Sequence, residues 1–178
     1  MCHVRDMVTI RAATLDDVAD ITQIANAFVG QRTIEWTETP PPERVRRAWL
    51  QARLARAFPV LVAVDERGGI QGYASYGDFR DSLLRPGYAR TVEHTVHVAQ
   101  PAWGRGVGRT LMQALCAHAR QAGKHVMLGA ISADNAESLA FHRKLGFVEA
   151  ARLPEVGFLF GRYLDLVLVM RRLDEGGG

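Results

Sequence analysis

The chain has 178 residues, of which 48% are hydrophobic and 23% charged, so we expect one globular domain over 1–178 with its core at about 8–173. No apolar run approaches the ~20 residues of a membrane-spanning helix, and the start of the chain lacks the apolar stretch of a signal peptide. We therefore expect a cytoplasmic protein with no membrane partner.

The net charge of +3 suits an anionic ligand, but the basic residues are scattered along the chain. The densest basic stretch, 44–56, interleaves arginines with apolar side chains, which favours the solvated face of an amphipathic helix over an RNA-binding face. We expect no nucleic-acid partner. Cys2 and Cys116 lie far apart in no metal-type or CxxC spacing, which favours reduced thiols.

Hydrophobic periodicity and turn residues predict the elements of the first half of the chain. In chain order they are a strand at 7–14, a helix from Thr14 or Asp16 to about Phe28, a helix from 40–43 to about 57, strands at 60–65 and 70–79, a polar loop at 80–90 and a strand at 91–98. The segment "ERGG" between the strands at 60–65 and 70–79 is a turn signal that makes them a hairpin.

The second half of the chain begins with a helix over 106–122, and Gly123 ends it. Its apolar stripe is Val107, Leu111, Met112, Leu115, Cys116 and Ala119. A buried strand at 125–131, a helix at 134–146 with a D-x-x-E capping box and a C-terminal Gly146, and strands at 147–153 and 159–173 follow. This order predicts an α/β (α+β) fold with a mostly antiparallel sheet.

The loop "WGRGVGRT" (103–110) lies between a predicted strand and a predicted helix. Such a loop can direct successive backbone N–H groups into one concavity at the positive end of the helix dipole. Gly106 and Gly108 let a phosphate approach the backbone, and Arg105 and Arg109 add positive charge. The loop is therefore a candidate diphosphate site, with a plain tight turn as the alternative.

Two common nucleotide motifs do not fit this loop. A Walker loop needs GK[ST], which is absent, and a dinucleotide fold needs GxGxxG with an acidic residue ~20 positions later. Here the glycine spacing is GxGxG, and Asp134 is too distant.

Segment 103–108 resembles the acetyl-CoA motif of the GNAT N-acetyltransferases, [QR]-x-x-G-x-G/A, with Trp103 departing at the first position. The segments 91–98, 132–147, 156–173 and 34–41 are similar to the phosphinothricin and methionine sulfoximine acetyltransferase branch, and the similarity spans about 8–173. The resemblance implies a GNAT-type fold, acetyl-CoA as cosubstrate, direct acetyl transfer in a ternary complex, and a homodimer.

Acetyl transfer to an amine needs a base for the amine and benefits from a proton for the departing thiolate. Glu93 matches the glutamate of the family's TVE motif, which implies a base acting directly or through water; an exposed carboxylate or an ion pair to Arg90 is the alternative. His142 stands where the family has a group near the coenzyme sulfur, which implies a thiolate acid or polar contact; a structural role is the alternative. His94 and His97 are three apart on a strand, which separates their rings, so we expect no metal.

The resemblance also implies the binding residues. For acetyl-CoA these are His97 and Val98 through their backbone, Arg105, Gly106, Val107, Gly108, Arg109 and Thr110 at the pyrophosphate, and Asn135 and Ser138 at the pantetheine arm. Asn135 is alternatively only a helix cap. For the acceptor they are Arg80 or Arg90 as a carboxylate clamp, Trp36, Phe79 and Tyr88 against the side chain, and Thr91 in the pocket wall 77–93.

We expect the acceptor to be the α-amine of a small amino acid. An α-amine with a pKa near ~8 costs about 1.4 kcal/mol to deprotonate at pH 7, whereas a lysine near ~10.4 costs roughly 4.6 kcal/mol. The resemblance implies phosphinothricin, methionine sulfoximine or methionine sulfone. Two alternatives stay open: an enzyme for another amine, such as a protein N-terminus or a polyamine, and a non-catalytic acyl-CoA sensor.

Overall fold

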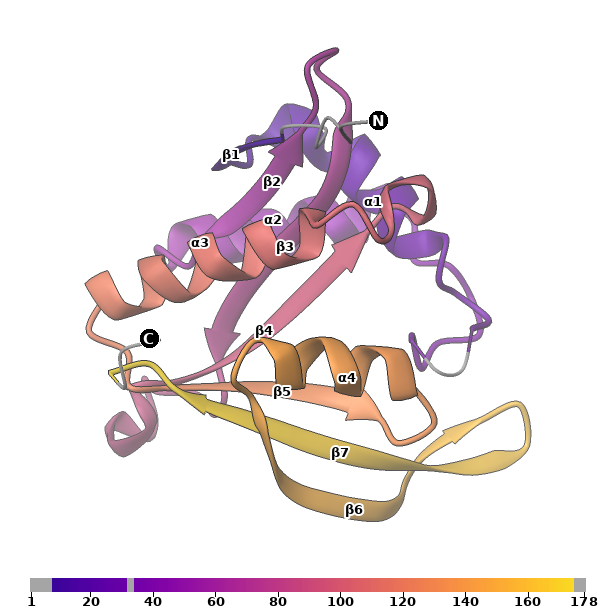
Figure 1. Cartoon of the computed structure of the whole chain (residues 1–178), viewed down its shortest axis with the longest axis vertical. Helices are drawn as coiled ribbons and strands as arrows, with labels where there is room; N and C mark the ends of the chain where they lie inside the picture. The colour runs from indigo at the N-terminus through magenta and orange to yellow at the C-terminus, as the bar shows by residue number, and fades with distance from the viewer. Residues whose placement is uncertain (1–7, 32–33, 175–178) are drawn as a thin grey trace, which may run out of the picture. The chain divides into compact units, whose positions relative to one another are not determined.

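The computed structural model describes residues 8–31 and 34–174, and Figure 1 traces them by element. Over these residues seven strands are hydrogen-bonded in the order β1-β2-β3-β4-β5-β7-β6. The strands are β1 (Thr9–Ala12), β2 (Val60–Val64), β3 (Ile70–Asp78), β4 (Thr91–Val98), β5 (Val126–Ser132), β6 (Val148–Leu159) and β7 (Arg162–Arg172). The sheet is mostly antiparallel, with β4 and β5 parallel, so the predicted mixed α/β fold is confirmed.

The helices match the predicted positions closely. They are α1 (Val18–Asn26), α2 (Glu43–Ala55), α3 (Val107–Gln121) and α4 (Ala136–Lys144), with short 3₁₀ turns at Leu15–Asp17, Pro86–Tyr88 and Gln100–Ala102. The described residues form two compact units. The first unit comprises 8–27, 41–76 and 95–118, and the second comprises 28–31, 34–40, 77–94 and 119–174.

In the first unit, the entry to α1 is fixed by a charged cluster. The Asp17 carboxylate accepts the Thr14 backbone N–H at 2.7 Å and both terminal nitrogens of Arg11 at 2.7 and 2.8 Å. These contacts hold the pKa of Asp17 below its usual range, with the Arg11 hydrogen bond as the main cause. Thr14 precedes the first 3₁₀ turn, so the predicted helix start at Thr14 is confirmed.

Burial follows the predicted helical periodicity. The six stripe residues of α3 are all buried: Val107, Leu111, Met112, Leu115, Cys116 and Ala119. The apolar face of α1 is buried in the same way. Since helical stability in proteins comes mainly from packing of such a face, these two helices are explained by their sequence pattern.

In the second unit, α4 begins one residue later than the predicted capping box implies. Asn135, not Asp134, is the N-cap, and its Oδ1 accepts the Ser138 N–H at 2.9 Å. The prediction of a D-x-x-E box is therefore wrong by one position, because Asn and Asp cap almost equally well and sequence alone does not choose between adjacent candidates. Gly146 has a φ of +83°, as expected for the residue after a helix.

The C-terminal strands also differ from the prediction. The interval 159–173 is not one strand, because β6 continues to Leu159 and the chain then reverses at Phe160 and Gly161. Both turn residues have positive φ, 47° and 73°, which is the backbone of a type I′ hairpin turn. An aromatic residue rarely adopts this conformation, so a turn at Phe160 is hard to predict from local residue preferences.

Candidate active site

The loop 103–110 of the first unit leads from β4 into α3. Gly104 and Gly106 have φ values of +74° and +87°, a region that favours glycine. The Gly106 carbonyl accepts the Thr110 N–H at 3.0 Å, so the helical hydrogen bonding of α3 starts there. The first N–H groups of a helix have no acceptor within the helix, and here they follow two glycines that leave the approach open.

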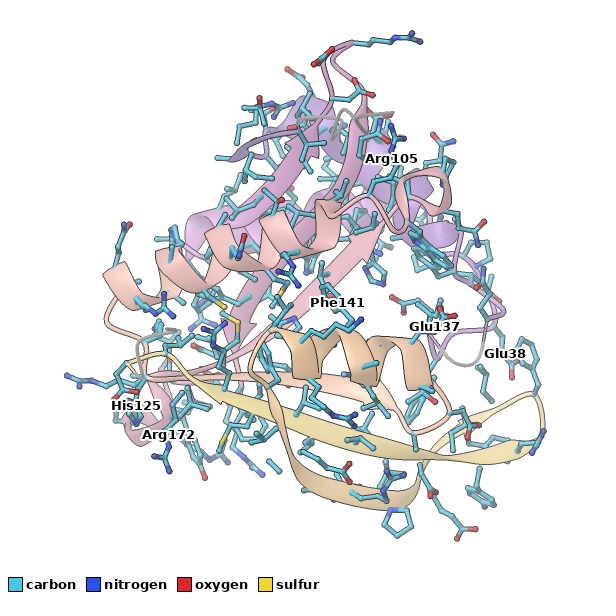
Figure 2. All side chains as sticks on the ribbon, viewed as in Figure 1. Glu38, Arg105, His125, Glu137, Phe141 and Arg172 are labelled. Carbon is cyan, nitrogen blue, oxygen red and sulfur yellow. The ribbon has the colours of Figure 1, made fainter. Side chains whose placement is uncertain are left out.

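The charge around this helix start is positive. The first turn of α3 carries no acidic residue, and Arg105 and Arg109 are both exposed. Figure 2 shows Arg105 in the loop that precedes α3. A helix N-terminus, positive-φ glycines and two arginines are features that suit a diphosphate group, and binding of one by this loop stays a prediction. Of the two glycines predicted to admit the phosphate, Gly106 has positive φ, whereas Gly108 lies within α3.

Trp103, which departs from the family motif, has a defined role in the loop. Its Nε1–H donates to the Val98 carbonyl at 2.7 Å, so the indole ties the loop to the end of β4. The neighbouring residue His97 is held by a second contact, between its Nδ1 and the Tyr73 hydroxyl at 2.9 Å. A Cβ at Gly72 would lie 2.7 Å from the His97 carbonyl oxygen, so close packing of the backbone requires glycine there.

In the second unit, Val92 and His94 of β4 are buried, whereas Glu93 between them is partly exposed. This alternation is the one expected for a strand. Glu93 therefore lies on the face opposite His94.

His94 and His142 form a buried stacked pair. Their ring centroids are 5.1 Å apart with planes at 20°, and Phe147 packs edge-on against both rings. Both side chains are buried, and a Cβ at Gly129 would lie 2.7 Å from His94 Nε2. Burial lowers the pKa of His94 to about 3, and burial also lowers the pKa of His142. Both imidazoles are therefore neutral at neutral pH.

The tautomer of His142 follows from one hydrogen bond. Its Nδ1 lies 2.7 Å from the Ser138 carbonyl oxygen, and because a carbonyl only accepts, Nδ1 carries the hydrogen. Nε2 then carries the lone pair, and it is buried with no partner among the described residues. Neutral His142 thus offers a proton acceptor at Nε2 and can donate a proton there only after receiving one.

Several predicted acceptor residues lie together. Phe79 and Tyr88 stack edge-to-face at 6.2 Å, and the Arg80 guanidinium lies 5.7 Å from each ring centroid. The Thr91 carbonyl accepts the Phe79 N–H at 3.4 Å. The rings orient Arg80 through cation–π contact while leaving its exposed donors available.

The other predicted binding residues have separate contacts. The exposed Arg90 uses its backbone carbonyl to accept the N–H groups of His125 and Val126. Trp36 packs on Gly157 of β6. Asn135 and Ser138 hold the start of α4 together, so the capping role considered for Asn135 is confirmed, and binding of pantetheine by either residue stays a prediction.

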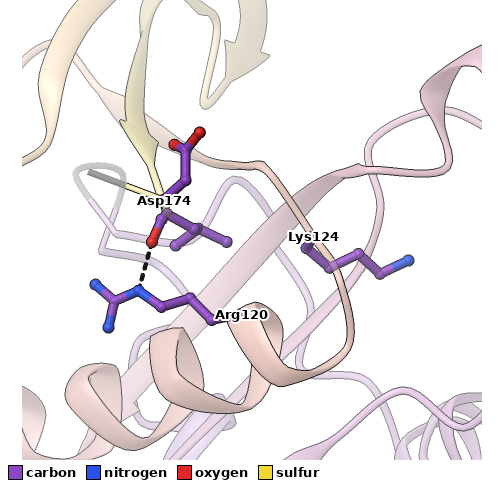
Figure 3. A pocket seen from close by; sticks show the side chains of 4 residues that line it. Arg120, Lys124 and Asp174 are labelled. Atoms are coloured by element: carbon purple, nitrogen blue, oxygen red, sulfur yellow. Dashed lines mark hydrogen bonds between the residues drawn. The ribbon is translucent and has the colours of Figure 1, made fainter. Parts of the chain in front are cut away.

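A hollow of about 340 Å³ lies elsewhere in the second unit, lined by Arg120, Lys124, Leu173 and Asp174 (Figure 3). Arg120 Nε donates to the Leu173 carbonyl, and Lys124 Nζ donates to the Ala89 carbonyl at 2.7 Å. Both cationic side chains therefore donate hydrogen bonds to backbone carbonyls. The hollow contains none of the predicted site residues.

Within 8–31 and 34–174, no group of three or more His, Cys, Asp or Glu is placed to hold a metal ion. Among the helices that the structure describes, none combines the length and apolarity needed to cross a bilayer. Cys116 is buried in α3, and Cys2 lies outside the described residues.

Three residues not singled out as site residues contact ones that were. Tyr73 contacts His97, His94 stacks on His142, and Gly157 receives Trp36. Strand alternation indicates that His94 lies on the face away from Glu93. The contacts themselves could not be predicted, because all three join segments far apart in sequence.

Comparison with known proteins gives a consistent result. The acetyltransferase (GNAT) family profile matches residues 21–147. An L-methionine sulfoximine/L-methionine sulfone acetyltransferase of Pseudomonas paraeruginosa is 45% identical over 93% of this chain and 95% of its own length. A phosphinothricin N-acetyltransferase of Alcaligenes faecalis is 36% identical over 94% of this chain and 84% of its own.

Solved structures are similarly close. A putative acetyltransferase from Salmonella typhimurium, determined with its cofactor acetyl-CoA, has a TM-score of 0.87 and 41% identity over 97% of both chains. A ribosomal-protein-alanine N-acetyltransferase from Brucella melitensis has a TM-score of 0.86 and 41% identity, covering 92% of this chain and 99% of its own.

Proposed function

Since the chain belongs to the GNAT acetyltransferase family and is an acetyl-CoA-dependent N-acetyltransferase, we propose that it acetylates the α-amine of a small amino acid or analogue. The acceptor is of the phosphinothricin, methionine sulfoximine or methionine sulfone type, as the names of two curated relatives indicate. Transfer is direct, within a ternary complex. The reaction needs acetyl-CoA, a cytoplasmic metabolite, so we place the protein in the cytoplasm.

The loop 103–110 and the end of β4 bind the acetyl-CoA. The loop from Arg105 to Thr110 binds the pyrophosphate through the amides of the α3 start and the two arginines, each charge-assisted hydrogen bond contributing roughly 1.5–3 kcal/mol. The backbone of His97 and Val98 binds the pantetheine arm. This loop, with its paired positive-φ glycines, is the observation that carries the proposal.

Segment 77–93 supplies the acceptor chemistry. Glu93 takes a proton from the substrate ammonium, directly or through water. The neutral nitrogen attacks the thioester carbonyl carbon, the C–S bond breaks, and the sulfur takes a proton as coenzyme A leaves. Arg80, oriented by two aromatic rings, or Arg90 binds the substrate carboxylate in bidentate fashion.

Incubation of the protein with acetyl-CoA and a panel of free amino acids, including the three analogues above, tests this proposal. We expect mass spectrometry to find an acetylated α-amine, and Glu93→Gln to lower kcat/KM roughly 100-fold while calorimetry finds coenzyme A binding unchanged. Failure to acetylate any free amino acid refutes the substrate class. A Glu93→Gln rate equal to the wild type removes Glu93 as the base.

A second candidate acceptor is a protein N-terminus, because one structural neighbour at 41% identity is named for acetylating a ribosomal protein's alanine. A peptide beginning with alanine belongs in the same assay. Turnover of the peptide with a kcat/KM above that of every free amino acid would select this candidate instead. Binding of coenzyme A with no turnover of any amine would indicate a sensor.

We also propose a homodimer. The β6–β7 region of the second unit exposes large apolar side chains. The rings of Phe158 and Tyr163 have their centroids 5.0 Å apart, and the two residues are 61% and 64% exposed. Its other exposed apolar residues are Val148, Leu153, Val156 and Phe160. Such clustering marks protein interfaces. Sedimentation should find a dimer that Phe158→Ser with Tyr163→Ser dissociates; a monomeric wild type contradicts the proposal.

A further inference from the structure

Residues 34–40 of the second unit contact the β6–β7 hairpin at Gly157. Three atoms of the Trp36 ring lie within 2.9 Å of the position that a Cβ on Gly157 would occupy. Gly157 is not among the glycines with positive φ, so its backbone conformation does not require glycine. Glycine inside a strand weakens it by roughly 0.5–1 kcal/mol relative to alanine. The Trp36 ring therefore explains why position 157 lacks a side chain.

A second contact fixes the same segment two residues later. The Phe160 N–H donates to Glu38 Oε1 at 2.9 Å, at the turn that closes the hairpin. Figure 2 shows Glu38 beside this turn. Phe160 has a φ of 47°, which is costly for an aromatic residue, and the carboxylate satisfies its N–H. The position of the Trp36 ring is thus fixed by its packing on Gly157 and by the hydrogen bond between Glu38 and the Phe160 N–H two residues later in the segment.

We propose that Gly157 is a specificity-determining residue, because the Trp36 indole packs on it and is thereby positioned for the side chain of the acceptor. This inference rests on the proposed function, in which Trp36 contacts the amino-acid side chain. Trp36 is half-buried, and three atoms of its ring are fixed against the strand at Gly157. A rigid indole in one position discriminates between side chains better than a mobile one.

The test is a mutant cycle read out by acceptor kinetics. Gly157→Ala places a methyl group inside the ring position, so the indole must move; a displacement of this kind can raise the acceptor KM roughly 10-fold to 100-fold. The KM for acetyl-CoA should stay within about twofold, because the change is at the acceptor side chain alone. Ala150→Ser, which adds one atom to an exposed position on the same strand, is the matched control.

The second arm of the cycle removes the ring. Trp36→Leu leaves room for the methyl group, so Gly157→Ala should have no further effect on the acceptor KM in that background. If Gly157→Ala alone does not fold, Glu38→Ala replaces it, because losing the acceptor of the Phe160 N–H should loosen the same segment and raise the acceptor KM with the KM for acetyl-CoA unchanged. An unchanged acceptor KM in that variant overturns the proposal.

Three further outcomes overturn the proposal. They are an unchanged acceptor KM in Gly157→Ala, equal rises in the KM values of both substrates, and an alanine effect that persists in Trp36→Leu. A wild type that acetylates no amino acid refutes the proposed function, and the specificity role with it. Turnover by the wild type with an unchanged acceptor KM in Gly157→Ala refutes only the positioning role of Gly157.

Discussion

Replacing His94 by leucine should make the protein less sensitive to acid. The buried imidazole has a pKa lowered to about 3 from 6.5, because burial disfavours its charged form. Between these values the unfolded chain binds a proton that the native state does not, so the free energy of unfolding falls as the pH falls. At pH 5, which is about 1.5 units below the pKa of the imidazole in the unfolded chain, protonation stabilises the unfolded state by about 2 kcal/mol.

The assay is urea unfolding at pH 7.5 and pH 5.0. We expect the wild type to lose about 2 kcal/mol more stability on acidification than His94→Leu, since leucine fills a similar volume and cannot be protonated. The comparison within each variant cancels any change in packing. His142 faces His94 and shifts in the same direction, so the wild-type loss exceeds the His94 share and only the difference between variants isolates it.

Val92→Ala is the control, because Val92 is buried on the same strand and carries no titratable group. It changes packing alone, so its loss of stability on acidification should match that of the wild type. The reasoning is refuted if His94→Leu loses as much stability on acidification as the wild type. It is also refuted if nuclear magnetic resonance finds the native His94 ring titrating near 6.5.

Two further predictions concern the first unit. Asp17→Ala should lower the free energy of unfolding by about 2–3 kcal/mol at pH 7 by removing the acceptor of Thr14 and Arg11, as measured in urea; a loss below about 0.5 kcal/mol contradicts the role. Gly106→Ala should weaken coenzyme A binding roughly tenfold in calorimetry, because alanine at a φ of +87° is strained by about 1–2 kcal/mol. Gly69→Ala, in the β2–β3 turn, is the control for Gly106→Ala. If the two variants bind coenzyme A with equal affinity, loop 103–110 does not bind it.

The elements predicted best are those whose packing follows a simple period. The α3 stripe and the alternation of Val92 and His94 in β4 need only one face to be buried, which a sequence pattern states directly. The hairpin turn at Phe160 was missed because its conformation is stabilised from outside the hairpin, by the Glu38 carboxylate. Local propensity contains no information about such a partner.

The candidate site divides in the same way. The glycine loop is local, so its place between β4 and α3 could be predicted from composition. Which of its glycines adopt positive φ could not, since these are Gly104 and Gly106, whereas Gly108 lies in α3. The stacking of His94 on His142 and the packing of Trp36 on Gly157 depend on how distant segments meet. The sequence alone indicates which residues are chemically reactive. It does not show which distant neighbours determine their protonation state or position.

The protonation state of His142 bears on how the proposed reaction disposes of its protons. Acetylation of an ammonium group removes two protons from nitrogen, and one of them ends on the sulfur of coenzyme A. The partly exposed Glu93 can pass the first proton to solvent. Because Nδ1 of His142 already donates to Ser138, only Nε2 is available, and it is an acceptor in the neutral ring.

If His142 protonates the departing thiolate, it must therefore first take the second proton from the nitrogen. Burial affects the two steps in opposite ways, since a lowered pKa makes the neutral ring a weaker base and the protonated ring a stronger acid that releases the proton readily. The two residues then have separate tasks, and loss of one leaves the other's proton transfer intact. Glu93→Gln should weaken the first transfer and His142→Phe the second, so the double variant should be slower than either single variant.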